Sequence, residues 1–414
     1  MKKIIIIILS IIILSISFII YKELEFNIES IELPKKYNAK CLDGSPYKFQ
    51  YIKGINEGKN NYIIYFEGGG YCGSELRPTT TIESCRKRAL TSKGKNTLFP
   101  FFILSRFMKF FSSKKKHNPI FYDWNKVIIK YCDGMGHLSN KDNYGLYFRG
   151  LNNTLGVLDY INEKYSFKNA NKVIISGYSA GAISALQWSK FIENYTLKKN
   201  NTFLIIDSGI FVSIDKNNKN EGERNFDNLM KEIVKYSGDN DIVLKSYCKY
   251  YNNEEERFKC YIPEIMINEV KIPILVLQNE MDSWMISHFL KESCFFNFKF
   301  LNNCSPDKIK KIQNYGKQIG QNLKKIYEEN DNIGMWIPKT IGHVLVHFNF
   351  FWDNTFYSVN NYNLMNIINN WYKNVSIGNK YNYFYTDNSY NKINNYIDMS
   401  NYMIIFGINK LEDY

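Results

Sequence analysis

The chain has 414 residues, 45% of them hydrophobic, which excludes a disordered protein and allows a large α/β core. The formal net charge is +13, yet the lysines are scattered, and Lys114, Lys115 and Lys116 form the one tight lysine run. Because a short charge run is typical of a solvated loop, we expect no nucleic-acid partner.

The N-terminus joins Lys2 and Lys3 to a nearly unbroken apolar run over residues 4–21. Such a run directs a chain to the secretory membrane, so residues 1–22 are expected to form a signal peptide or a signal anchor. No small-x-small cleavage motif follows, which slightly favours an anchor, although the length is near the lower limit for a membrane span. The remaining chain is expected to be secreted, or membrane-anchored with its folded part extracellular or lumenal.

Eight cysteines agree with an exported chain, because an even number outside the cytosol favours disulfides. No CxxC pair is present, so the cysteines do not predict a zinc site. Other connectivities are open, but short loops favour the pairs Cys72–Cys85, Cys248–Cys260 and Cys294–Cys304, and leave Cys41 with Cys132. Sequons permit N-glycosylation at Asn152, Asn194, Asn200, Asn303 and Asn374.

After the apolar run, residues 24–37 are expected to form a short stalk, and residues 47–54 one arm of a hairpin. Residues 61–66 predict a buried strand that ends in Glu67, Gly68, Gly69 and Gly70. Three consecutive glycines let backbone N–H groups approach a ligand closely, as an oxyanion hole requires. A flexible loop or a phosphate cradle is the alternative, but the Gly-Lys-Ser/Thr ending of a phosphate loop is absent.

Residues 126–131 predict the next strand, and residues 147–163 a helix. A β-branched run at 172–176 then leads into Gly177-Tyr178-Ser179-Ala180-Gly181 and a helical stretch. A strand, a tight turn with glycine at both ends and a helix are the layout of a nucleophile elbow. Such a turn holds its serine in strained geometry at a helix N-terminus, where free N–H groups receive an oxyanion. A chance motif is the alternative, and the strand-turn-helix context argues against it.

The rest of the chain continues the alternation of strands and helices. Strands are predicted at 202–206, 272–277 and 334–337, and an amphipathic helix at 308–329. This order predicts an α/β fold of the α/β-hydrolase type, with a mostly parallel sheet and helices on both faces. We expect one catalytic domain over residues 38–378 and a loosely packed, Asn- and Tyr-rich tail over 379–414.

A serine hydroxyl needs a base, and the base needs an acid that orients it. In this fold class the acid and the histidine follow the serine, so chain order excludes His117 and His137. His288 is expected on a helix. His343 lies on a loop beyond a strand and is the predicted base, whereas His347 lies in an apolar run and is expected to be a packed histidine.

Asp207 and Asp282 each end a predicted strand, so either is a candidate for the acid. Asp282 belongs to the strand after the one that ends in Asp207, which is the usual place of a triad acid, and chain order therefore favours it. Asp207 comes directly after the elbow unit and is expected to brace the neighbouring loops.

Several stretches, in family order over residues 38–350, together resemble the pectinacetylesterase/Notum family of serine carboxylesterases. They are residues 41–45, 67–72, 118–125, 131–134, 177–181, 207–209, 282–284 and 334–343. The resemblance implies Ser179 as nucleophile, Asp282 as acid and His343 as base. It also implies that Gly69, Gly70 and Ala180 donate the oxyanion-hole N–H groups. The chain departs from the family pattern at Tyr178, where members often have Cys or Ser, and at Ala182, where they have Gly; both changes concern substrate preference.

The predicted activity is exported carboxylic-ester hydrolysis that needs no metal or organic cofactor. The family implies two substrate classes, an acetylated polysaccharide or a secreted protein that carries a fatty acyl group. The competing function is a non-catalytic, membrane-tethered binding protein that kept the fold. Such relatives usually lose a triad residue, and this chain keeps all three.

Overall fold

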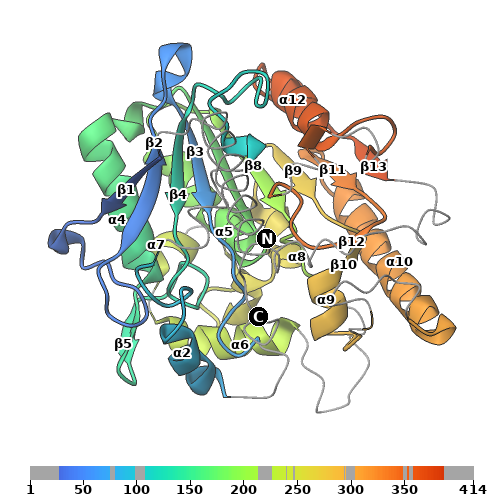
Figure 1. Ribbon diagram of the computed structural model, residues 1–414, viewed down its shortest axis with the longest axis horizontal. Helices are drawn as coiled ribbons and strands as arrows, with labels where there is room; N and C mark the ends of the chain where they lie inside the picture. Colours follow the sequence, from blue (N-terminus) through green and yellow to red (C-terminus); the bar gives the residue numbers. More distant parts are fainter. Residues whose placement is uncertain are drawn as a thin grey trace, which may run out of the picture.

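The computed structural model describes residues 28–74, 80–97, 108–212, 226–238, 240–245, 248–292, 294, 304–347, 352–353 and 358–386. Its centre is a nine-stranded sheet in the order β1-β2-β4-β3-β7-β8-β9-β11-β13 (Figure 1). Neighbouring strands from β4 to β13 run parallel, whereas β1 and β2 form an antiparallel edge. The mostly parallel α/β fold that the sequence predicts is thus confirmed.

The elements follow one another as strand and helix through most of the chain. The sheet strands are β1 (Ile28–Glu32), β2 (Lys48–Ile52), β3 (Asn61–Phe66), β4 (Asn125–Ile129), β7 (Lys172–Tyr178), β8 (Thr202–Asp207), β9 (Ile274–Leu277), β11 (Ile333–Ile337) and β13 (Phe384–Thr386). Two small sheets pair β5 (Lys141–Asn143) with β6 (Leu146–Phe148), and β10 (Met281–Asp282) with β12 (Ile341–Gly342). The helices are α2 (Thr81–Ala89), α4 (Gly150–Tyr165), α5 (Ala180–Tyr195), α6 (Phe226–Ser237), α7 (Asp241–Leu244), α8 (Pro263–Met266), α9 (Ser283–His288), α10 (Pro306–Glu328) and α12 (Leu364–Val375).

Alternate strand residues point to opposite faces of the sheet and enter two separate hydrophobic cores. On one face, Ile64 and Ile175 belong to a core that includes buried side chains of α4, α5 and α10. On the other face, Ile63 and Ile174 pack in a core with α12 and the segment 108–124. The sheet is therefore covered on both sides, which is why its central strands are apolar throughout.

The carboxyl ends of three central strands meet at one edge of the sheet. Phe66 at the end of β3 lies opposite Gly177 of β7, and Tyr178 lies opposite Asp207 at the end of β8. Loops that leave parallel strands at the same edge converge, and this edge is where α/β proteins bind ligands. The fold thus brings the glycine loop, the elbow and residue 208 to one place.

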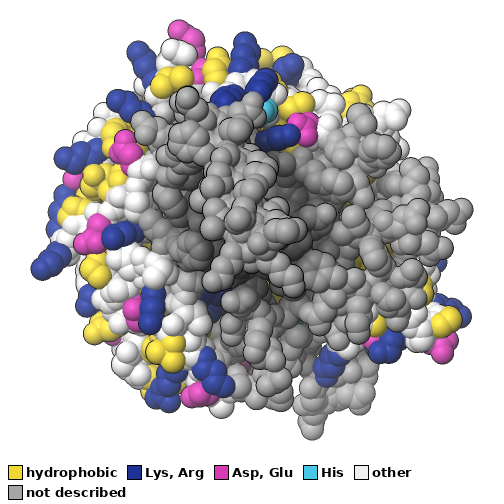
Figure 2. Space-filling view, in the orientation of Figure 1, with side chains coloured by type: hydrophobic (Ala, Val, Ile, Leu, Met, Phe, Trp, Pro, Cys, Tyr) yellow, Lys and Arg dark blue, Asp and Glu magenta, His cyan; other side chains and the backbone are white. Residues whose placement is uncertain are grey.

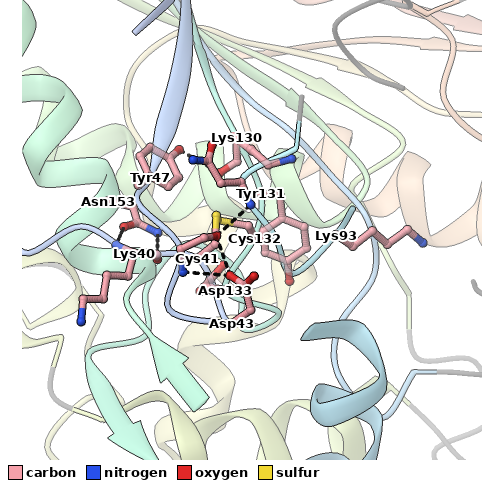
Figure 3. Close-up of a disulfide and its surroundings, with 12 residues drawn as sticks. Lys40, Cys41, Asp43, Tyr47, Lys93, Lys130, Tyr131, Cys132, Asp133 and Asn153 are labelled. Atoms are coloured by element: carbon pink, nitrogen blue, oxygen red, sulfur yellow. Dashed lines mark hydrogen bonds between the residues drawn. A yellow bond between two sulfur atoms is a disulfide. The ribbon is translucent and has the colours of Figure 1, made fainter. Parts of the chain in front are cut away.

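Four disulfides join the described cysteines in the pairs that the short-loop argument favours, Cys41–Cys132, Cys72–Cys85, Cys248–Cys260 and Cys294–Cys304. Figure 3 shows the Cys41–Cys132 disulfide, which joins the N-terminal part of the fold to the segment after β4. Beside it, the Tyr47 hydroxyl donates to the Lys130 carbonyl at 2.8 Å.

Both ends of the described chain are more ordered than the sequence predicts. The expected stalk over 24–37 is wrong from residue 28 onwards, because β1 pairs with β2 in register from Ile28 to Glu32. Beyond residue 378, Tyr381 is 7% exposed and β13 pairs with β11, so the first residues of the expected tail belong to the sheet. The sequence did not predict α2, α6 or α12 either.

The predicted N-terminal segment, residues 1–22, lies outside the described residues, as does Asn303. In the ranges that are described, no helix combines the length and apolarity needed to cross a membrane. In the face that Figure 2 shows, the Lys and Arg side chains of the described residues are spread out and form no stripe, as their scattered positions in the sequence predict.

Candidate active site

Ser179 occupies the turn between β7 and α5 in the geometry of a nucleophile elbow. Its backbone has φ 52° and ψ −129°, a conformation that is strained for a residue with a side chain. The flanking glycines are required by space, since a Cβ on Gly177 would lie 2.4 Å from the Gly181 carbonyl oxygen, and one on Gly181 2.2 Å from that of Phe66. Strand, turn and helix therefore hold Ser179 at the N-terminus of α5, where the helix dipole favours negative charge.

The glycine loop after β3 packs directly against the elbow. A Cβ on Gly68 would lie 3.0 Å from Cβ of Ser179, so the loop approaches the serine as closely as backbone can. Gly69 and Gly70 have φ of 149° and 67°, which suit glycine. Within the described chain, the N–H groups of Gly69, Gly70 and Ala180 make no hydrogen bond. Three backbone donors therefore remain available around Ser179.

His343 lies on the loop after β12 and is oriented by Asp282, the N-cap residue of α9. The Nδ1 atom of His343 lies 2.8 Å from Oδ2 of Asp282, and the carboxylate is completely buried. An ionised carboxylate can only accept a hydrogen bond, so Nδ1 carries the hydrogen and Nε2 has a free lone pair. In the described structure this buried Nε2 has no hydrogen-bond partner. The pair has the arrangement of a general base and its orienting acid.

The Asp282 carboxylate is fixed by three further donors. Its Oδ1 atom accepts the backbone N–H groups of Trp284 and Met285, each at 3.0 Å. The side-chain amide of Gln278 donates to Oδ2 at 2.9 Å. The sequence did not predict this contact of Gln278, although the residue directly follows β9, at the sheet edge where α/β proteins bind ligands.

Asp207 does not contact His343 directly but holds the loop that carries it. Its carboxylate accepts the backbone N–H groups of Leu345 at 2.9 Å and Val346 at 2.8 Å. Ser208 Oγ accepts the N–H of Val344, a β-branched residue at φ 69° that is strained there. Burial raises the pKa of Asp207 to about 6, although the Val346 and Leu345 N–H groups act in the opposite direction. Asp207 therefore holds the neighbouring loop in place, as expected from the sequence.

Three of the other histidines make contacts away from the Asp282–His343 pair. Nε2 of His347 lies 3.1 Å from the Tyr65 hydroxyl, and its ring packs 4.0 Å from that of Tyr178. Burial lowers the pKa of His347 to about 3, so the ring stays neutral. His137 is buried below the glycine loop with Nε2 2.9 Å from the Glu67 carbonyl oxygen, and His288 lies on α9, as expected.

Aromatic side chains line one side of the imidazole. The rings of Phe211 and Trp284 lie 4.9 Å apart, and their centroids are 6.1 and 6.4 Å from that of His343. Trp284 also stacks on His288 at 4.1 Å. These rings make this side of the imidazole apolar.

Two buried side chains of opposite charge, Glu67 and Lys130, interact electrostatically near the glycine loop. Burial raises the pKa of Glu67 and lowers the pKa of Lys130. The Lys130 charge opposes the rise in the Glu67 pKa, and the Glu67 charge opposes the fall in the Lys130 pKa. The Glu67 carboxylate accepts the N–H of Tyr131 at 2.9 Å. Among the residues that the structure describes, no three His, Cys, Asp or Glu side chains are grouped to hold a metal ion.

Comparisons with known proteins point to one family. The Pectinacetylesterase family profile matches residues 21–395. Pectin acetylesterase 5 of Arabidopsis thaliana is 25% identical over 82% of this chain and 78% of that protein. The palmitoleoyl-protein carboxylesterase NOTUM of Schmidtea mediterranea is 24% identical over 82% of this chain and 62% of that protein. The solved structure of the Wnt deacylase Notum from Drosophila shares the fold, with a TM-score of 0.69 and 16% identity over 87% of this chain and 97% of that chain.

Proposed function

The chain belongs to the pectinacetylesterase family and is a carboxylic ester hydrolase, and we propose that Ser179, His343 and Asp282 form its catalytic triad. One observation carries the proposal. The imidazole of His343 rests on the buried Asp282 carboxylate with a free Nε2, at the sheet edge that also holds a strained serine. The two parts are joined, because Asp207 accepts the Ser179 N–H with its carbonyl and the Leu345 N–H with its carboxylate.

In the proposed reaction, Ser179 Oγ attacks the acyl carbonyl carbon while Nε2 of His343 takes the hydroxyl proton. The carbonyl oxygen becomes an oxyanion, which the N–H groups of Gly69, Gly70 and Ala180 stabilise. Collapse breaks the ester bond, and the imidazolium gives its proton to the leaving alkoxide. Water then attacks the acyl-enzyme with His343 as base, and the carboxylic acid leaves with Ser179 restored. Asp282 keeps the imidazole in the required tautomer throughout.

For the substrate we favour an acetyl ester on a polysaccharide over a fatty acyl group on a secreted protein. The pectin acetylesterase relative matches over 78% of its length, compared with 62% for the palmitoleoyl-protein carboxylesterase. The rings of Phe211 and Trp284 beside His343 also suit a short acyl group. We further propose export to the secretory pathway, which the four disulfides support. N-terminal sequencing of the mature protein separates a cleaved signal from a retained anchor.

The test combines covalent labelling with a substrate series. A fluorophosphonate is expected to label the wild type and not the Ser179→Ala variant. Hydrolysis of p-nitrophenyl esters is expected to fall steadily from acetate to longer acyl chains. A preference for long acyl chains would instead favour a lipidated protein as the substrate. Absence of both labelling and hydrolysis in folded wild type would instead favour the non-catalytic binding protein.

A further inference from the structure

Helix α2 is attached to the glycine loop at several points. The Cys72–Cys85 disulfide joins the end of the loop to the middle of the helix, and Ser84 Oγ accepts the N–H of Gly73 at 2.6 Å. One turn further along α2, Arg88 donates from Nη2 to the carbonyl oxygen of Gly69. The helix therefore places a guanidinium on the loop that faces Ser179.

The contact with Gly69 acts on the peptide group that contains the Gly70 N–H. In a trans peptide, the carbonyl of one residue and the N–H of the next point in opposite directions within one plane. A donor on the Gly69 oxygen thus fixes the plane and leaves the Gly70 N–H directed away from Arg88. A cation on a carbonyl also polarises the peptide, so its N–H becomes a stronger donor.

The environment keeps the Arg88 charge effective. The residue is 8% exposed, and its guanidinium lies 5.4 Å from the ring centre of Tyr131, which Figure 3 labels beside the first disulfide. In the described chain no carboxylate forms an ion pair with it, and its Nη1 atom is buried without a hydrogen-bond partner. A buried cation that no anion neutralises favours negative charge nearby, and the oxyanion of the proposed reaction is such a charge.

We propose that Arg88 is a positioning residue that orients and polarises the Gly70 N–H for the oxyanion. This role rests on the proposed esterase mechanism, in which the Gly70 N–H stabilises the transition state. It predicts that Arg88 strengthens binding of a tetrahedral oxyanion more than binding of an uncharged ground state, because the polarised N–H interacts most strongly with developing negative charge. A purely structural arginine would affect both equally.

The experiment compares Arg88→Gln with Arg86→Gln, a matched control at an exposed position of α2. Ligands are an alkyl trifluoromethyl ketone, which Ser179 converts to a tetrahedral oxyanion, and the corresponding alcohol, which cannot react. Loss of one whole oxyanion donor costs roughly 10²–10³-fold, so loss of its support is expected to lower kcat/KM by about 10- to 100-fold. The Ki of the ketone should rise in parallel, while the Ki of the alcohol stays within about twofold and Arg86→Gln behaves as wild type.

Arg88→Lys keeps the charge on a shorter side chain and should recover part of the activity that Arg88→Gln loses. A folded Arg88→Gln with wild-type kcat/KM and ketone affinity would overturn the proposal, and so would equal weakening of ketone and alcohol. If Arg88→Gln does not fold, Arg88→Lys decides, and wild-type discrimination between the two ligands would then overturn it. A folded wild type that neither hydrolyses esters nor binds the ketone would overturn the esterase mechanism itself.

Discussion

Asp207 connects the serine to the histidine loop, because its carbonyl accepts the Ser179 N–H at 2.9 Å and its carboxylate accepts the Leu345 N–H at the same distance. Ser179 belongs to the elbow after β7, whereas Leu345 follows His343 by two residues. One residue at the end of β8 thus fixes two loops that are far apart in sequence. The geometry of the proposed triad therefore depends on a residue outside it.

The first prediction concerns this connection. In Asp207→Asn an amide NH₂ replaces one carboxylate oxygen, and because the Leu345 N–H lies 2.9 Å from both oxygens, this N–H faces another donor in either orientation of the amide. An unsatisfied buried N–H costs about 1–3 kcal/mol, and the loop is expected to shift to avoid it. We expect kcat to fall about tenfold or more with a small change in KM. Asp331→Asn, at an exposed site paired with Lys380, is the control. A folded Asp207→Asn with wild-type kcat would contradict the prediction.

The second prediction treats the proposed triad as a unit. Ser179→Ala and His343→Ala should each lower kcat by roughly 10⁴-fold, and the double variant should lose little more, because triad members act together. Asp282→Asn should lose about 10³- to 10⁴-fold, since the base remains but its tautomer is wrong. Steady-state hydrolysis of p-nitrophenyl acetate measures all four, with circular dichroism to check folding. Multiplicative losses in the double variant would show that the residues act independently.

Much of this site follows from local sequence. The elbow is predictable because its turn requires small residues and has a strand and a helix on either side, and the three glycines of the loop follow a recognisable strand. The choice of His343 follows from chain order and from its place beyond a strand. The four disulfide pairs follow from the short loops that three of them close.

The contacts that support the site could not be predicted in the same way. Gln278, Ser208 and Arg88 act through single hydrogen bonds between segments distant in sequence, and no periodicity or spacing encodes such a partner. The same holds for the sheet edges, where β1 has five residues and β13 has three. Strands this short carry too little pattern of their own, so their pairing depends on the neighbouring strand.

The third prediction uses the lowered pKa of His347. Folded protein keeps this ring neutral down to a pKa of about 3, whereas the unfolded chain protonates it near pH 6.5. Between these values the unfolded state binds the extra proton, so stability falls as the pH falls. Because the residue as a whole is only partly buried, we expect a loss of about 1–2 kcal/mol at pH 5. His347→Gln should lose correspondingly less stability between pH 7 and pH 5 in urea titrations, and an unchanged pH dependence would argue against a neutral His347.

The fourth prediction concerns acyl length. Because Trp284 packs with Phe211 beside the imidazole, Trp284→Ala should open space next to the reacting carbonyl. Each methylene accommodated in an apolar pocket is worth about 1–3 kcal/mol at most, so the ratio of kcat/KM for octanoate over acetate should rise by about tenfold or more. Tyr383→Ala, an exposed aromatic residue next to β13, is the control. An unchanged ratio would place the acyl group elsewhere.

The last prediction separates stability from catalysis with two disulfides that close loops of similar size. Cys72–Cys85 spans 13 residues and Cys248–Cys260 spans 12, so replacing either pair by serine should cost about 3 kcal/mol of unfolding free energy. The first disulfide ends the glycine loop and holds α2 against it, whereas the second joins segments after α7. Below the melting temperature of both variants, kcat should therefore fall about five- to tenfold only when Cys72 and Cys85 are replaced, because the proposed oxyanion donors lose their fixed positions. Equal kcat values in the two variants at equal stability would show that the disulfide does not position the loop.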